Sequence, residues 1–552
     1  MRKNLWYMVL FLLLLSSCGV SRSLRDRPVL TGLDSTVPVV QQHEGTLRTS
    51  GNNFMLQNPQ NLWELYVEGD ALHRGLTEGA LTEHLHKHQE HIFFDRLTEW
   101  VPSPSKQKWM GKFIKFYNRK LYRYIPQEYK AEIYGISQYA SHEYDDIAPG
   151  YVRGLYLHGV HDLGHALQDL AIVGCSSFAI KGDRTDDGGL LLGRNFDFNA
   201  GDEFARNKVV SFIKPATGYP FMTVTWAGMI GAVSGMNAQG LTVTINAARS
   251  KVPLAARTPI SIVTREVLQY AKNIEEAIAI VRKKEVFVSE SIMVGSAADN
   301  KAVIIEVSPT DIGVYESADT GMLICTNHYQ SSEMKDGKRN RYQIKNSHSQ
   351  YRYDRLMTLL DSSGKIGPVK AAAILRNKEG KNGLALGYGN EKALNQLMAH
   401  HSVIFKLAKR LVWVSANPYQ MGDYVCYDLN KIFNSGSIST PATTLAEERL
   451  IIPGDPFLAT QEYKNYELFR IQDRQMDTIL KKHSVMPPGF AQNYQSLNPD
   501  HWIVYYKVGL YFYRRREYTA AAGHFEKALT KEITTLPAKK KTEQYLKKAR
   551  SK

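Results

Sequence analysis

Residues 175–192 read CSSFAIKGDRTDDGGLLL, and this stretch decides how the middle of the chain folds. Two runs rich in β-forming and apolar residues, 175–180 and 190–192, flank a polar segment that ends in the turn signal Asp187-Gly188-Gly189. A polar, Gly-containing loop between two such runs is typical of a β-hairpin. The pattern predicts a hairpin whose first strand begins at Cys175, immediately after Gly174.

Further strand patterns continue on both sides of a helical segment. Between residues 259 and 284 the periodicity is helical, with a break near Asn273, and Pro259 suits a first helical turn. This order predicts an α+β domain over residues 175–440, with two sheets packed face to face and helices outside. The remaining predicted strands are 209–213, 222–226, 241–245, 292–294, 302–307, 312–315 and 323–325.

The first residues have the pattern of an export signal. Met1-Arg2-Lys3 is basic, an apolar run follows from Leu5 to Leu15, and Leu15-Ser16-Ser17-Cys18 resembles a bacterial lipobox. The apolar run is short for a helix that spans a bilayer. We therefore expect residues 1–17 to be a lipoprotein signal peptide and Cys18 to carry the lipid anchor. An ordinary signal peptide with an incidental cysteine is the alternative.

Export and lipidation together predict a soluble body tethered to a membrane by acyl chains. Residues 19–23 contain no acidic pair of the kind that sends some bacterial lipoproteins to the cell surface. This favours the outer membrane with the protein facing the periplasm.

Three other segments flank the predicted α+β domain. Residues 18–58 are polar and predict a tether with little structure, whereas residues 59–174 predict a helical unit. Residues 441–552 form a C-terminal extension, and 502–550 resembles one tetratricopeptide-type helical hairpin. One such hairpin cannot bury its own apolar face, so we expect it to pack on the main domain, a protein partner being the alternative.

Composition excludes several function classes. The net charge of +15 is spread along 552 residues, and the densest basic cluster, in the last turns of the chain, is typical of a solvated helix face. No zinc-finger, RNP-like or helix-turn-helix pattern is present, so we expect no nucleic-acid partner, and we expect no cofactor. Four cysteines are too few for a disulfide framework. Cys325 and Cys426 could pair after export, but we expect free, buried thiols.

Cys175 is the candidate nucleophile. Its thiol can attack the carbonyl of the preceding Gly174, giving a thioester that water opens, and a glycine tolerates the backbone angles this attack needs. The product is a cysteine with a free α-amine, whose ordinary pKa of about 8 lets it accept the thiol proton near neutral pH. Nucleophile and base then lie in one residue. Taken alone, Cys175 would be read as a buried structural cysteine.

Four stretches change that reading. They are GCSSF at 174–178, LGRNFDF at 192–198, GMNAQGLTVTIN at 235–246, and TNHY at 326–329 followed by YRYDRL at 351–356. In order and spacing they resemble the cysteine N-terminal-nucleophile (Ntn) hydrolases. Within these, the resemblance is closest to the acyl-coenzyme A:6-aminopenicillanate acyltransferases, with choloylglycine hydrolases and penicillin V acylases as more distant relatives.

The resemblance implies a fold and a set of site residues. The fold is a four-layer αββα sandwich, in which residues 59–174 are the helical propeptide. Asp197 would hold the α-amine, Arg194 would lower the pKa of the thiol, and Arg352 would complete the charged network. Asn246 and Asn327 would offer side-chain amides to the oxyanion.

Each assignment has a structural alternative. Arg194 and Asp197 could form a plain salt bridge across a turn, and Asn246 could cap a strand end. Arg355 competes with Arg352 for the position of the family arginine.

The resulting hypothesis is a self-processing hydrolase or acyltransferase that acts on a linear C–N amide bond of a small acyl amide. Hydrolysis and acyl transfer both remain open. Two rival functions are a phospholipase B-like lipid-ester hydrolase, which shares the nucleophile logic, and a non-catalytic binding lipoprotein on the same scaffold.

His158, His161 and His165 form the one metal-like cluster of the sequence. The spacing of His161 and His165 would place both on one helix face. No His-Glu-x-x-His arrangement and no third ligand accompany them, so we predict no metal site.

Overall fold

The computed structural model describes residues 19–100, 103–159, 162, 174–198, 201–251, 253, 255–317, 320–434 and 443–552. The predicted signal peptide 1–17, the predicted lipidation site Cys18, and His161 and His165 lie outside these ranges. Within them, no helix combines the length and the apolar character that crossing a bilayer requires.

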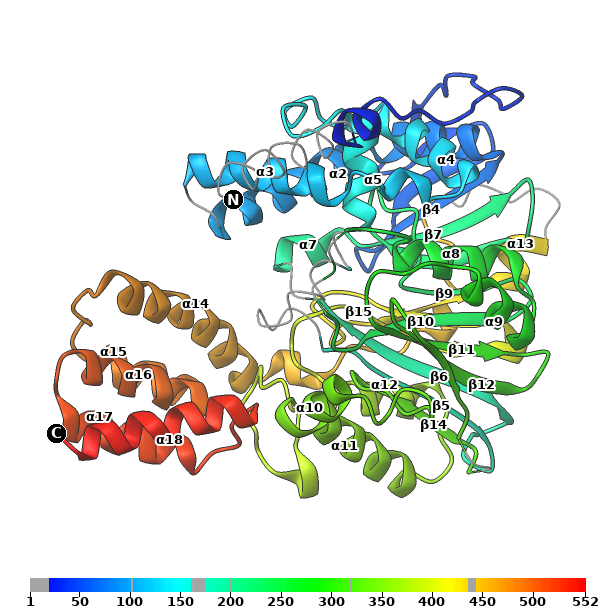
Figure 1. Cartoon of the computed structure of the whole chain (residues 1–552). Helices are drawn as coiled ribbons and strands as arrows, with labels where there is room; N and C mark the ends of the chain where they lie inside the picture. Colours follow the sequence, from blue (N-terminus) through cyan, green and yellow to red (C-terminus); the bar gives the residue numbers. More distant parts are fainter. Residues whose placement is uncertain are drawn as a thin grey trace.

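Two β-sheets form the centre of the molecule (Figure 1). All of their pairings are antiparallel except that of β4 with β7. The larger sheet has the order β1 (Gln41–Gln42), β2 (Arg48–Ser50), β3 (Asn53–Gln57), β4 (Trp63–Gly69), β7 (Val209–Pro215), β8 (Phe221–Thr225), β9 (Ser234–Asn237), β10 (Leu241–Ala247), β11 (Glu290–Ser296), β12 (Lys301–Val307), β13 (Ile312–Tyr315). The smaller has the order β14 (Met322–Cys325), β5 (Ser176–Gly182), β6 (Gly188–Asp197), β15 (Ala399–Lys406), β16 (Leu411–Ser415), β17 (Tyr424–Asp428).

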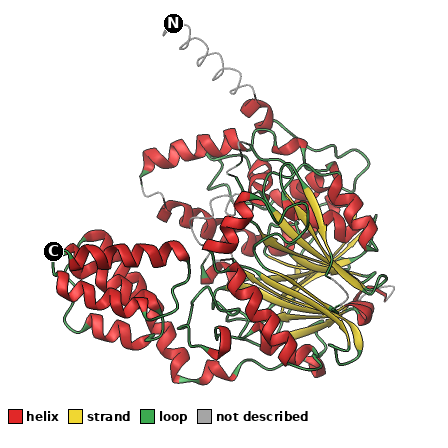
Figure 2. Cartoon of the chain, turned by 60° about the horizontal axis from the view of Figure 1, so that its bottom comes forward, coloured by secondary structure: helices red, strands yellow, loops and turns green. Residues whose placement is uncertain are grey.

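The helices cover the outer faces of the sheets, and a group of helices forms the C-terminal end of the chain (Figure 2). They are α2 (Ala71–Trp100), α3 (Pro104–Tyr117), α4 (Gln127–Ser137), α5 (Gly150–His158), α7 (Asp202–Arg206), α8 (Ile260–Tyr270), α9 (Ile274–Arg282), α10 (Lys338–Asn346), α11 (Ser349–Ser362), α12 (Pro368–Leu375), α13 (Leu429–Asn434), α14 (Gln461–Lys482), α15 (Phe490–Leu497), α16 (Trp502–Arg514), α17 (Tyr518–Leu529) and α18 (Leu536–Arg550).

Three hydrophobic cores separate four layers. The core between the sheets joins residues of both, such as Met222 from the larger and Val403 from the smaller. A second core packs α8 and α9 on the outer face of the larger sheet, and a third packs α11 and α12 on the outer face of the smaller. The predicted α+β, αββα fold is confirmed, and the break near Asn273 is where that residue caps α9 by accepting a hydrogen bond from the Glu276 N–H.

The N-terminal part differs from the expectation. Residues 18–58 were expected to have little structure, but 41–57 contain strands β1, β2 and β3 of the larger sheet, and 63–69 form strand β4 rather than helix. In β4, Leu65 points into the outer core and Tyr66 into the core between the sheets. The run 62–67 fits an alternating strand, but Leu62, Leu65 and Tyr66 also have the i, i+3, i+4 spacing of a helix, and periodicity does not separate the two in so short a run.

The helical unit before Cys175 is joined to the α+β domain by more than one peptide bond. β4 pairs in parallel with β7, and α2 packs closely on α4, where a Cβ on Gly75 would lie 2.1 Å from the Glu132 carbonyl oxygen. The buried Glu132 carboxylate receives Arg74 at 2.7 Å and Arg265 of α8 at 3.2 Å. The strand pairing and the ion pairs hold the unit in place whether or not the chain is continuous at residue 174.

The C-terminal helices α14 to α18 form a bundle that packs on the main domain, as expected for 502–550. Its core includes Leu397 and Tyr419 from the α+β domain. In addition, the Asn390 side chain donates a hydrogen bond to the Glu532 carbonyl at 3.0 Å. The tetratricopeptide character of the hairpin stays a prediction.

Candidate active site

The β5–β6 hairpin and its neighbours bring the predicted site residues together. Cys175 directly precedes β5, and the register places Ser177 of β5 opposite Arg194 of β6. On the other side of β5, Ser177 also pairs with Cys325 of β14. The remaining site residues are Asp197 at the end of β6, Asn246 on β10, Asn327 after β14 and Arg352 on α11.

The Cys175 thiol is buried beside a guanidinium. Nη2 of Arg194 lies 3.6 Å from Sγ. Burial raises the pKa of the thiol to about 11, because the desolvation of the thiolate and the charge of Asp197 outweigh the positive charge of Arg194. The sulfur is therefore protonated near neutral pH, and a thiolate forms there only if a base takes the proton.

Arg194 is fixed by backbone carbonyls of the opposite sheet. It donates to the carbonyl of Val233 at 3.1 Å and to that of Ile245 at 2.5 Å, and also to Ser234 Oγ. Its guanidinium carbon lies 4.3 Å from the centre of the Phe196 ring. The bonds hold one nitrogen toward the sulfur, which is not the arrangement of a plain salt bridge to Asp197.

Asp197 is buried and only partly paired. Oδ2 accepts a hydrogen bond from Gln396 Nε2 at 3.3 Å, whereas Oδ1 has no hydrogen-bond partner among the residues that the structure describes. Burial raises the pKa of this carboxyl to about 7, with Arg352 and Arg194 acting in the opposite direction. The Asp197 carbonyl also accepts the Gly174 N–H at 3.1 Å, so the backbone before the cysteine runs beside the carboxylate.

Gln396 is a site residue that the sequence did not reveal. Its Nε2 donates to the Gly174 carbonyl oxygen at 2.9 Å, which is the carbonyl the thiol would attack. A Cβ on Gly174 would lie 2.7 Å from Gln396 Nε2 and 2.9 Å from Oε1. A side chain at position 174 would thus displace the donor. No motif surrounds Gln396, which lies far along the chain in the loop before β15, so no sequence signal pointed to it.

Arg352 links the cysteine to one of the predicted oxyanion residues. Nη1 donates to the Cys175 carbonyl at 2.5 Å and to Ser176 Oγ at 2.7 Å, and Nη2 donates to Asn327 Oδ1 at 2.6 Å. Arg355 instead donates to Asn377 and pairs with a glutamate of the same loop. Arg352 is therefore the arginine that reaches the cysteine.

The two asparagines have their amide donors on backbone carbonyls in this form of the chain. Asn246 Nδ2 donates to the Cys325 carbonyl at 3.1 Å, and its Oδ1 accepts from Ser177 Oγ at 2.9 Å. Asn327 Nδ2 donates to the Ala247 carbonyl at 2.8 Å. Asn246 joins the larger sheet to β5 and β14 of the smaller, so its position is fixed by both sheets rather than by a strand end.

The other candidate residues have structural roles. Cys175, Cys325 and Cys426 are free and buried, as expected for the last two. His158 accepts the Ile230 N–H at 3.1 Å, and its second ring nitrogen lies 2.8 Å from a backbone carbonyl. Across the described ranges, no group of three or more His, Cys, Asp or Glu side chains is placed to hold a metal ion.

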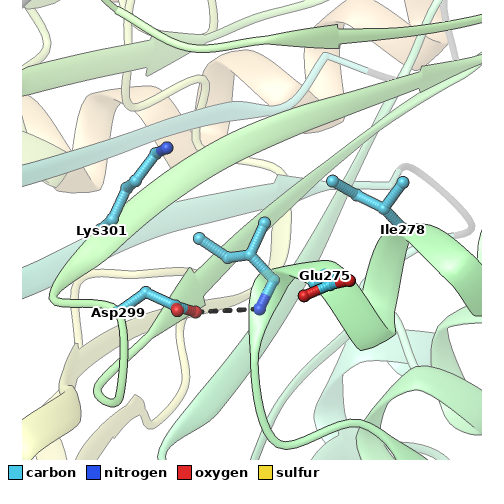
Figure 3. Close-up of a pocket in the computed structure, with 5 residues that line it drawn as sticks. Glu275, Ile278, Asp299 and Lys301 are labelled. Atoms are coloured by element: carbon cyan, nitrogen blue, oxygen red, sulfur yellow. Dashed lines mark hydrogen bonds between the residues drawn. The ribbon is translucent and has the colours of Figure 1, made fainter.

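Figure 3 shows a surface pocket that none of the predicted site residues lines. It lies between the start of α9 and the turn after β11, where Asp299 accepts the Ile274 N–H at 2.9 Å and caps the helix. Cys175 lies near the opposite end of β11, where Ser291 pairs with Asn246. The pocket is therefore separate from Cys175. Its walls are Ile274, Glu275, Ile278, Asp299 and Lys301.

Residues 184–417 match the family of acyl-coenzyme A:6-aminopenicillanic acid acyl-transferases, so the predicted resemblance is confirmed over that range. The range contains every site residue described above except Gly174 and Cys175. A curated protein of Archaeoglobus fulgidus, described as uncharacterized, is 25% identical over 339 residues, which are 55% of this chain and 54% of that protein. The chain thus matches only about half the length of this relative.

Two solved structures are also similar to the chain. One is an N-acylethanolamine-hydrolyzing acid amidase ortholog from Caenorhabditis elegans, with 16% identity, 42% of this chain and 93% of that chain covered, and a TM-score of 0.32. The other is a mutant conjugated bile acid hydrolase from Clostridium perfringens, with 16% identity, 49% and 98% covered, and a TM-score of 0.33.

Proposed function

We propose that this chain, whose residues 184–417 match the acyl-coenzyme A:6-aminopenicillanic acid acyl-transferase family, is a self-processing cysteine amidohydrolase or N-acyltransferase. The observation that carries the proposal is the set of contacts around one peptide bond. Gln396 donates to the Gly174 carbonyl, Arg352 donates to the Cys175 carbonyl, and Arg194 reaches the sulfur. Every buried carbonyl needs a donor, but a structural cysteine has no need of a guanidinium beside its sulfur together with a side-chain amide on the carbonyl before it.

Self-cleavage is the first step of the proposal. Sγ loses its proton and attacks the Gly174 carbonyl carbon, Gln396 donates to the developing oxyanion, and the C–N bond to Cys175 breaks as its nitrogen gains a proton. Water then opens the thioester. Gly174 ends as a carboxylic acid, and Cys175 has a free α-amine and a free thiol. Asp197, with a pKa raised to about 7 by burial, is the nearby group able to accept the thiol proton.

Turnover uses the amine that cleavage creates. The α-amine accepts the thiol proton, the thiolate attacks the acyl carbonyl of the substrate amide, and the proton passes to the leaving amine. Water or an acceptor amine then takes the acyl group from the sulfur. The unpartnered Oδ1 of Asp197 is available to hold the α-amine, and Arg194 stabilises the thiolate. Asn246 and Asn327 serve the oxyanion once their Nδ2 donors turn from the carbonyls they now contact.

A denaturing gel tests the cleavage step. The purified protein should run as two fragments that meet at Gly174 and Cys175, and Cys175→Ala should run as one chain. Labelling with iodoacetamide at Cys175 should block turnover of the cleaved protein. A protein that stays one chain and does not react at Cys175 would contradict both steps.

A paired substrate panel tests the bond that is cut. N-acyl amides and esters with the same acyl groups should be offered to the parent and to Cys175→Ala. We expect Cys175-dependent release from the amides, and added acceptor amines separate acyl transfer from hydrolysis. Release from the esters alone would favour a lipid-ester hydrolase instead.

We also propose that the chain is exported and anchored through a lipid on Cys18, in the outer membrane and facing the periplasm. The lipobox-like segment before Cys18 supports this. Mass spectrometry of the mature protein is the test. In the parent, the N-terminal peptide should begin at a lipid-modified Cys18. In Cys18→Ser, the N-terminal peptide should carry no lipid and should still include the leader.

A further inference from the structure

Helix α3 exposes an aromatic stripe. Trp109, Phe113 and Phe116 are 68%, 42% and 37% exposed, and their i, i+4, i+7 spacing puts them on one helix face. The Trp109 and Phe113 rings stack with centroids 5.8 Å apart. Tyr117, whose ring stacks on Phe113 with centroids 6.0 Å apart, and Ile114 pack on the helical core. These two residues hold α3 in place, so the exposed faces of the aromatic stripe are not needed for that.

Basic side chains border this stripe. α3 carries four lysines, and no acidic residue occurs from Pro104 to Leu121. By helical spacing Lys106 lies on one side of the stripe and Lys112 on the other, with Lys108 beyond it. The Arg119 guanidinium carbon lies 3.8 Å from the centre of the Phe116 ring and extends the basic border past the helix end.

The start of the described chain lies at the same place. A Cβ on Gly19 would be 3.4 Å from Cδ of Arg119. A nearby contact fixes this position, because Asp26 forms an ion pair with Lys130 at 2.7 Å. Gly19 thus lies beside the basic end of α3, and α3 lies at the outer edge of the N-terminal helical layer (Figure 1).

We propose that the outer face of α3 is a membrane-contact surface that lies on an anionic lipid bilayer, with Trp109, Phe113 and Phe116 in the headgroup region and the flanking lysines on lipid phosphates. Trp and Phe on one side of a helix with lysines at its borders are the chemistry of interfacial helices. Aliphatic stems of the lysines can lie along the aromatic rings while the ammonium groups reach the phosphates.

Charge favours a bilayer over a second copy of the chain. Two copies that met through this face would bring lysines against lysines in a low-dielectric contact, which is repulsive. An anionic surface attracts the same lysines. The surface would also stabilise attachment where one acyl chain holds a protein only marginally.

The test separates α3 from any lipid on Cys18. The chain from residue 19 onward, which comprises every residue the structure describes, is sedimented with vesicles of phosphatidylglycerol and phosphatidylcholine, and with phosphatidylcholine alone. We expect binding to the anionic vesicles that weakens with added salt, and at least tenfold weaker binding to phosphatidylcholine.

Three variants give the experiment its controls. Replacing Trp109, Phe113 and Phe116 together by Ser should weaken binding to anionic vesicles at least tenfold, and replacing Lys106, Lys108 and Lys112 by Gln should remove the preference for them. Leu468→Ser with Ile471→Ser, which removes similarly exposed apolar side chains from α14, should bind like the parent.

Equal binding by the parent and the aromatic variant would overturn the proposal. So would the absence of binding to either vesicle, which would leave a protein partner as the occupant of this face. Cleavage at Cys175, scored on a denaturing gel of the same samples, reports separately on the proposed function.

Discussion

At the scale of single residues, the site is a set of donors whose positions depend on one another. Gln396 reaches the Gly174 carbonyl only because residue 174 has no side chain, and the same nitrogen lies 3.3 Å from Asp197. A substitution at Gly174 or Gln396 therefore changes the hydrogen bonding of the Gly174 carbonyl and leaves the Cys175 side chain unchanged.

Gln396→Ala should slow self-cleavage by about a hundredfold, because one preorganised oxyanion donor contributes roughly that much to a rate. The rate is measured as the loss of uncut chain on denaturing gels over time. Gln420→Ala is the matched control, since Gln420 is a buried glutamine of the same domain that does not contact Gly174.

Gly174→Ala should also slow cleavage, because its Cβ would displace the Gln396 amide. Combining both substitutions should cost less than the product of the two single effects, since each removes the same contact. Full additivity would show that Gln396 does not act on this carbonyl.

Asp197→Asn should stabilise the uncut protein at neutral pH while stopping turnover. Burial raises the pKa of Asp197 to about 7, so the folded state binds more protons than the unfolded state between about pH 4 and 7. The contribution of Asp197 to the stability of the parent is therefore greatest below about pH 4 and is lost as the pH rises to 7.

This comparison is made in the Cys175→Ala background, which stays one chain. The advantage of Asp197→Asn in thermal unfolding should grow from pH 4 to 7 and be constant above pH 7. An advantage that is the same at pH 4 and pH 8 would mean that the carboxyl is not desolvated.

At the scale of elements, the unit before Cys175 contributes strands to the larger sheet of the α+β domain. Strands β1 to β4 continue the larger sheet past β7, and Glu132 of α4 pairs with Arg265 of α8. The predicted propeptide shares a sheet and buried ion pairs with the rest of the fold, so we expect it to stay bound if the chain is cut before Cys175.

After self-cleavage the two fragments should stay together under native conditions. The β4–β7 pairing and the buried ion pairs do not depend on the cut bond. Size-exclusion chromatography should give one species of the mass of the intact chain, and the same peak should show two bands after denaturation. Separation of the fragments in native buffer would contradict this picture.

The close contact of α2 with α4 allows a sharper test. Gly75→Ala would place a Cβ 2.1 Å from the Glu132 carbonyl oxygen, so we expect a loss of stability of about 1–3 kcal/mol, typical of overpacking. Gly111→Ala in α3 has no atom within 4 Å of the new Cβ and should be neutral or slightly stabilising. Thermal unfolding of both variants checks the difference.

At the scale of the whole molecule, the C-terminal bundle of helices α14 to α18 packs on the α+β domain. Gly387 lies in the contact between them, and a Cβ added to it would be 2.3 Å from the His501 backbone nitrogen. Gly387 belongs to the same loop as Gln396. Weakening the contact between the bundle and the domain is thus expected to displace Gln396 from the candidate active site.

Gly387→Ala should expose the bundle to limited proteolysis and slow self-cleavage. Gly489→Ala is its control, because both glycines have a positive φ, of 77° and 74°, but nothing lies within 4 Å of a Cβ on Gly489. Equal protease sensitivity of the two variants would mean that the backbone strain, and not the contact between the bundle and the domain, causes the effect.

The sequence by itself determined the order of strands, helices and strands from 175 to 325, because half-buried strands and amphipathic helices have distinct apolar periods. It also singled out Cys175, Arg194, Asp197, Asn246, Asn327 and Arg352, because motif residues keep a fixed spacing. It did not predict strands β9, β15, β16 and β17, nor strand β4, whose short run of residues fits the spacing of a helix as well as that of a strand.

Only the tertiary structure decided three things. It chose Arg352 over Arg355, because one turn of α11 determines which guanidinium points at Cys175. It joined the N-terminal strands to the catalytic sheet, since strand pairing between distant segments leaves no local signal. It brought Gln396 to Gly174, because a contact between residues more than two hundred positions apart is set by how the sheets pack and not by any spacing in the chain.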